Sequence, residues 1–126
     1  MDNKELFDLR MSEMMRLQKE LQAAHPEWGG LNPQQGLRQL LWMVGEIGEV
    51  IDVVKKADRA EYMNGTDLRD HFVEEFCDVM MYLVDTMLCY GIDPAEFAHA
   101  YRKKAAYNLK RDYEGANQKK YGPKKG

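Results

Sequence analysis

The chain has 126 residues, of which 44% are hydrophobic and 31% are charged, which is typical of one soluble globular domain. Its net charge of −3 argues against a protein that binds nucleic-acid polymers through bulk positive charge. We expect no membrane span, because no apolar run is long enough. The charged N-terminal residues lack the apolar core of a signal peptide. Cys77 and Cys89 are too far apart on one predicted helix to form a disulfide, and reduced thiols predict a cytoplasmic protein.

The first half of the sequence predicts two helices. Apolar residues at helical spacing predict a helix over 4–24, which ends because the residue before Pro26 disfavours helical backbone geometry. Asn32 followed by Pro33 is a typical helix start. The apolar stripe that follows predicts a second helix over 33–61.

The second half predicts two more helices, over 67–90 and 94–113, and a basic flexible tail. We therefore expect one domain over 1–114 and a tail over 115–126. Because no segment alternates like a strand, the fold class is all-α, a four-helix bundle. The third helix is apolar around much of its circumference, which predicts an oligomer that covers it.

Two pairs of carboxylates are the strongest chemical signal. Glu46 and Glu49 lie in the second predicted helix and Glu75 and Asp78 in the third, each pair at the i,i+3 spacing of one helix face. Apolar residues flank both pairs, and burying carboxylates together is unfavourable unless a cation neutralises them. One such pair is ordinary on a helix surface. Two pairs that face each other across a hairpin predict a site for Mg²⁺ or Mn²⁺.

Two other groups of residues accompany the acids. Lys104, Asn108 and Arg111 form one stripe of the fourth helix. Such a stripe can bind a phosphate chain, although it is more often a solvated face. Gln39 and Trp42 precede the first acidic pair and could hydrogen-bond and stack on a nucleobase; a surface glutamine and a core tryptophan are the alternative interpretation.

The order of these motifs resembles that of the all-α nucleoside triphosphate pyrophosphohydrolases of the MazG-like superfamily. The resemblance covers roughly residues 37–111 and rests on the double acid motif followed by the Lys/Asn/Arg motif. It implies that the four acids bind Mg²⁺ and that the basic stripe contacts phosphates in its own or a neighbouring subunit. It further implies a homodimer or homotetramer that hydrolyses a (deoxy)nucleoside triphosphate to the monophosphate and pyrophosphate, often to clear unwanted nucleotides.

The expected chemistry is attack of an activated water on the α-phosphorus. Among the acids we favour Glu49 as the base, because Lys56 falls close to it on the same helix face and could tune it. His71 and Asp85 lie on the acidic face of the third helix, and the sequence assigns neither of them a role. Trp28 is a second candidate for stacking on a base or for anchoring its loop.

Three other functions compete with this one. A phosphoribosyl-ATP pyrophosphohydrolase would share the fold and the acids but have a different substrate. A di-iron bundle needs Glu-x-x-His pairs, and neither Glu46 nor Glu75 has a histidine three residues later. A non-catalytic helical interaction module would bind no Mg²⁺ and release no pyrophosphate.

Overall fold

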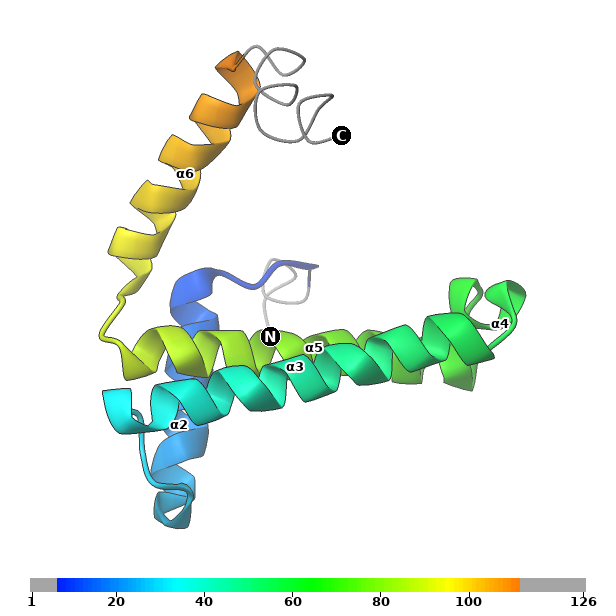
Figure 1. Ribbon diagram of the computed structural model, residues 1–126, viewed down its shortest axis with the longest axis horizontal. Helices are drawn as coiled ribbons and strands as arrows, with labels where there is room; N and C mark the ends of the chain where they lie inside the picture. The colour runs from blue at the N-terminus through cyan, green and yellow to red at the C-terminus, as the bar shows by residue number, and fades with distance from the viewer. Residues whose placement is uncertain (1–6, 112–126) are drawn as a thin grey trace, which may run out of the picture. The chain divides into compact units, whose positions relative to one another are not determined.

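The computed structural model describes residues 7–111, and the predicted tail over 115–126 lies outside them. The described chain is all-α, as predicted (Figure 1). Its elements are α2 (Met11–Ala24), a 3₁₀ turn η1 (Pro26–Trp28), α3 (Pro33–Lys56), α4 (Arg59–Met63), α5 (Asp67–Cys89) and α6 (Pro94–Lys110). The chain divides into two compact units, residues 1–93 and 94–126, so α6 is described separately from the other helices. None of the described helices has the length and apolarity needed to span a membrane.

The helices α3 and α5 form the frame of the first unit. They lie side by side and run in opposite directions (Figure 1). Pro33 occupies the first turn of α3, where its missing N–H has no helical partner to lose. Thr66 caps α5, since its hydroxyl accepts a hydrogen bond from the Arg69 backbone N–H at 3.3 Å. The left-handed Gly91 (φ 73°) follows the end of α5, as expected for a helix stop.

The prediction of one continuous helix over 33–61 is wrong after residue 56, where α3 ends. Ala57 has extended backbone angles (φ −95°, ψ 154°), which end α3. Asp58 then caps the short helix α4, because its carboxylate accepts a hydrogen bond from the Ala60 backbone N–H at 3.2 Å. A side chain that caps a new helix competes with continuation of the old one. The connection between α3 and α5 consequently contains a helix of its own, α4.

The helix α2 packs against α5 and supplies part of the core. The buried apolar side chains are Met15 from α2 and Val84, Met87 and Cys89 from α5. Polar side chains are buried beside them, among them Gln18, Gln22 and Asp85. A core that holds several polar groups requires that each be hydrogen-bonded or serve a ligand, and this requirement leads to the site.

Candidate metal centre and adjoining pocket

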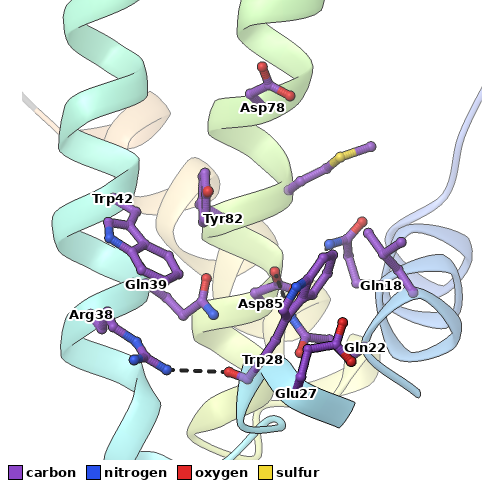
Figure 2. Close-up of a pocket in the computed structure, with 12 residues that line it drawn as sticks. Gln18, Gln22, Glu27, Trp28, Arg38, Gln39, Trp42, Asp78, Tyr82 and Asp85 are labelled. Carbon is purple, nitrogen blue, oxygen red and sulfur yellow. Dashed lines mark hydrogen bonds between the residues drawn. The ribbon is translucent and has the colours of Figure 1, made fainter. Parts of the chain in front are cut away.

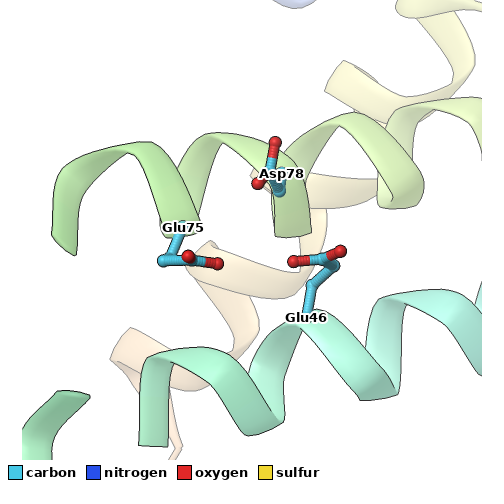
Figure 3. A group of neighbouring side chains, drawn as sticks. All are labelled: Glu46, Glu75 and Asp78. Atoms are coloured by element: carbon cyan, nitrogen blue, oxygen red, sulfur yellow. The ribbon is translucent and has the colours of Figure 1, made fainter. Parts of the chain in front are cut away.

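Three of the four predicted acids converge between α3 and α5. Glu46 of α3 faces Glu75 and Asp78 of α5 (Figure 3), and one oxygen from each carboxylate lies within 4.8 Å of the others. Glu75 is only 8% exposed, Glu46 is half-buried and Asp78 is exposed. Three carboxylates without a thiolate form the donor set that suits a hard cation such as Mg²⁺ or Mn²⁺. The residues therefore fit the predicted ion.

The negatively charged carboxylates of the cluster repel one another. Desolvation raises the pKa of Glu46 above its ordinary value, and the nearby charges of Asp78, Glu75 and Glu49 raise that pKa further. A cation or a proton at this place relieves the repulsion. The arrangement therefore favours a positive ion electrostatically, and exposed acidic groups are also common without one; the Mg²⁺ or Mn²⁺ site stays a prediction.

His71 contacts the cluster from one turn earlier on α5. Its Nε2 lies 3.0 Å from Glu75 Oε1, an i,i+4 pair. The contact holds one oxygen of the most buried of the three clustered acids, which limits the rotamers that Glu75 can adopt. His71 thus orients Glu75, a role that the sequence did not assign.

Glu49 and Lys56 lie apart from the three converging acids. Glu49 is exposed and is not among the acids whose oxygens meet within 4.8 Å, but its charge contributes to the raised pKa of Glu46. Lys56 Nζ lies 3.8 Å from Asp52 Oδ2, one turn earlier on α3. The ion pair of Lys56 is therefore with Asp52, and a role for Lys56 beside Glu49 stays a prediction.

A pocket of about 510 Å³ adjoins the acidic cluster (Figure 2). Asp78 belongs to both, so the pocket opens beside the candidate metal site. Both residues predicted to contact a base, Gln39 and Trp42, line this pocket. The complete lining is Gln18, Leu21, Gln22, Glu27, Trp28, Arg38, Gln39, Trp42, Asp78, Met81, Tyr82 and Asp85.

Three aromatic residues, Trp28, Trp42 and Tyr82, line the pocket. Trp42 meets Tyr82 edge-on, with ring centroids 5.9 Å apart, and the Arg38 guanidinium lies 5.1 Å from the Trp42 ring centroid. Arg38 also donates to the Trp28 carbonyl at 3.3 Å (Figure 2) and to the Gln35 side chain. These contacts tie the loop that carries Trp28 to the start of α3. A planar, partly polar ligand would find stacking surfaces here.

The deep side of the pocket is polar and buried. Asp85 is 5% exposed and accepts hydrogen bonds from Gln18 Nε2 at 3.0 Å and Gln22 Nε2 at 3.3 Å. Burial raises the pKa of Asp85, and the two amide hydrogen bonds oppose that rise. The sequence prediction missed Gln18 and Gln22. Their i,i+4 spacing inside the apolar stripe of α2 was the available signal, because buried glutamines need partners.

The predicted phosphate-binding residues lie in the second unit. Lys104 and Asn108 are exposed on α6, and Arg111 follows the helix directly. The Lys104 Nζ and the Arg111 guanidinium lie 5.5 Å and 5.9 Å from the Tyr107 ring centroid, so both cations share one side of the helix. Their action toward the acidic cluster stays a prediction.

Comparison with protein-family models, with curated proteins and with solved structures finds no match for this chain. The resemblance to the MazG-like pyrophosphohydrolases therefore depends on the sequence motifs and stays a prediction.

Proposed function

We propose that this protein is a Mg²⁺-dependent nucleoside triphosphate pyrophosphohydrolase that hydrolyses a (deoxy)nucleoside triphosphate to the monophosphate and pyrophosphate in the cytoplasm. The main support for the proposal is that Asp78 belongs both to the acidic cluster and to the lining of the adjoining pocket. That pocket has a volume of about 510 Å³ and two tryptophans in its wall. A nucleoside in that pocket would direct its phosphates toward the acids, and the pocket volume is in the usual range for small-molecule sites.

Each group then has a defined task. Glu46, Glu75 and Asp78 would hold Mg²⁺, which when bound polarises a phosphoryl oxygen and lowers the pKa of a water. Glu49, exposed about one helix turn after Glu46 on α3, would accept the proton of the attacking water. As the new bond to the α-phosphorus forms, the α-phosphorus–oxygen bond to pyrophosphate breaks. Lys104, Asn108 and Arg111 would bind the phosphate oxygens that gain charge.

Assembly as a homodimer or homotetramer is part of the proposal. An exposed apolar stripe runs along α3 through Leu37, Leu41, Val44 and Ile51, which are between 50% and 64% exposed. Gly48 lies on the same stripe, and a Cβ built on it would meet no described atom within 4 Å. Such a stripe leaves apolar area in water and lets a partner helix approach closely. A second copy of the chain would bury it.

The test is pyrophosphate release with Mg²⁺ across canonical and modified nucleoside triphosphates and phosphoribosyl-ATP. We expect release from at least one nucleoside triphosphate, loss of release in EDTA, and loss in Glu75→Gln. The matched control is Glu20→Gln, which removes a carboxylate from the exposed Arg16–Glu20 pair on α2. Formation of a nucleoside diphosphate and orthophosphate would contradict the mechanism. An interaction module would give no release and no Mg²⁺ binding.

A further inference from the structure

The Arg38 side chain joins the two segments that carry the tryptophans of the pocket. Its guanidinium lies 5.1 Å from the ring centroid of Trp42 on α3, and it donates at 3.3 Å to the carbonyl of Trp28, the last residue of η1 (Figure 2). The same nitrogen also donates to the Gln35 side chain. A planar guanidinium can lie over a ring and donate hydrogen bonds at once, which the compact ammonium of a lysine cannot do. Arg38 therefore links η1 to α3 at the pocket.

The direction of the Arg38 side chain is fixed by its own helix. Gln35 and Trp42 lie three residues before and four residues after Arg38, so both share its face of α3. The Trp42 ring is held in turn by Tyr82 of α5, whose ring it meets edge-on at 5.9 Å. Because these contacts orient the guanidinium from α3 and α5, the hydrogen bond to the Trp28 carbonyl carries that position over to η1.

The backbone after η1 is shaped to receive the α3 side chains. Gly29 has a left-handed φ of 97°, and a Cβ added there would lie 2.7 Å from Gln35 Nε2 and 3.4 Å from Arg38 Nη2. A residue without a side chain therefore allows both groups to approach the loop. Asn32 Nδ2 donates to the Gly29 carbonyl at 2.9 Å and closes the turn into α3. The contact of Arg38 with the loop thus depends on the residue at the point of approach.

Trp28 keeps ring surface available to a ligand. His25 stacks on one face of the indole, with ring centroids 4.1 Å apart and an interplanar angle of 11°. Trp28 lines the pocket and His25 does not, so the pocket meets the other face or the edge of the indole. The side chain is 42% exposed, which leaves apolar area for stacking. Its position follows the backbone that Arg38 holds.

From these contacts we infer that Arg38 is a positioning residue, which holds Trp28 at the pocket so that its ring stacks on the planar part of the ligand. Gln35 and Trp42 orient Arg38, Arg38 holds the η1 backbone, and Trp28 meets the ligand. Holding an aromatic surface in place before binding lowers the entropy lost when the ligand binds. The inference rests on the proposed function for the identity of the planar part as a nucleobase.

The first experiment needs no ligand. The chain has two tryptophans, so Trp42→Phe leaves Trp28 as the only one and keeps an aromatic ring beside the guanidinium. Adding Arg38→Ala to this variant should release η1 and raise the acrylamide quenching constant of Trp28 fluorescence at least about 1.5-fold. An unchanged quenching constant overturns the positioning role.

Gln35 provides a variant outside the pocket. Gln35 is not among the lining residues, so a change there reaches Trp28 only through Arg38 and the loop. Gln35→Ala should raise the quenching constant in the same direction as Arg38→Ala. The matched controls are Gln34→Ala, at the exposed neighbouring position of α3, and Arg16→Ala, which removes an exposed arginine from α2. Both controls should leave Trp28 quenching unchanged.

The second experiment measures binding of dAMP, dCMP, dGMP and dTMP with Mg²⁺ by isothermal titration calorimetry. We expect Arg38→Ala to raise the Kd of each nucleotide that binds at least about fivefold. In a Trp28→Ala background the same change should alter Kd less than about twofold, because the residue through which Arg38 acts is gone. An equal rise in both backgrounds overturns the inference, since Arg38 would then contact the ligand itself. Failure of all four nucleotides to bind overturns the stacking role of Trp28.

The outcomes separate the inference from the proposed function. If Arg38→Ala frees Trp28 and weakens nucleotide binding but no triphosphate releases pyrophosphate, the positioning role stands and the hydrolase proposal fails. If pyrophosphate is released, a positioning role predicts that Arg38→Ala raises KM and changes kcat less than about twofold. Release with an unchanged KM in Arg38→Ala leaves the hydrolase proposal standing and overturns the positioning role.

Discussion

Glu46 on α3 and Asp78 on α5 bring carboxylate oxygens within 4.8 Å of each other across the antiparallel helix pair, and Glu75 joins them. The three negatively charged carboxylates repel one another, and a bound cation would remove this repulsion. Mg²⁺ should therefore stabilise the fold by mass action, by about 2.7 kcal/mol when its concentration is 100 times its Kd. Thermal melts with and without millimolar Mg²⁺ measure this. A melting temperature that does not respond to Mg²⁺ would contradict a site at this cluster. Ser12→Glu on α2 is the control for the effect of added negative surface charge on the response to Mg²⁺.

The raised pKa of Glu46 predicts a pH dependence of the metal-free protein. Desolvation and the charges of Asp78, Glu75 and Glu49 raise this pKa above the reference value of 4.5, so the folded state binds the proton more tightly than the unfolded state. The contribution of Glu46 to stability is therefore full below pH 4.5 and is lost as the pH rises through the raised pKa. Glu46→Gln should remove this pH dependence. Melts of both proteins in EDTA between pH 4 and pH 8 measure it, and a constant difference across that range would count against the prediction.

Asp85 should matter more to stability than its single charge suggests. Asp85→Leu leaves the Nε2 donors of Gln18 and Gln22 buried without their acceptor, which costs about 1–3 kcal/mol for each donor that finds no other partner. Asp85→Asn keeps an acceptor oxygen and should cost less. Urea denaturation of the two variants provides the comparison. Equal stability of the leucine and asparagine variants would show that these hydrogen bonds add little.

The sequence predicted the helices well where local chemistry decides them and failed where two local signals compete. The predicted start of α3 at residue 33 and the predicted bounds of α5 near residues 67 and 90 are confirmed, because caps and left-handed glycines act locally. The break at Ala57 was missed, although aspartate is a better N-cap than helix-interior residue, because capping of a new helix by Asp58 competes with continuation of α3.

The candidate site was likewise predicted correctly where local spacing determines it and missed where it depends on helix packing. The i,i+3 spacing placed Glu46, Glu75 and Asp78 on facing helices, so their convergence was predictable from the hairpin. The pairing of Gln18 with Asp85 was not, since these residues are far apart in sequence and their contact depends on how α2 packs across α5. Spacing within one helix says nothing about that packing.

Glu49→Gln should lower turnover at least a hundredfold, because the variant cannot take a proton from the attacking water. The fold should persist, since Glu49 is exposed and forms no ion pair with another described residue. Steady-state kinetics of pyrophosphate release and a thermal melt give the two readouts. Near-native turnover in Glu49→Gln would exclude Glu49 as the base.

In Arg111→Ala we expect the KM for the nucleotide to rise while the Mg²⁺ dependence stays unchanged.

The apolar stripe of α3 predicts that a charge within it disrupts assembly. Leu41 is 61% exposed and lies between Leu37 and Val44 on that stripe. Leu41→Glu would place a carboxylate in the partner interface, where burial of an unpaired charge is strongly unfavourable. Light scattering should then find a smaller species than in the wild type, which we expect to exceed the 14.7 kDa of one chain. Ser12→Glu adds the same charge on α2 and should leave the mass unchanged. A wild-type mass of one chain at micromolar concentration would contradict the proposed oligomer, because the exposed stripe would then be stable in water without a partner.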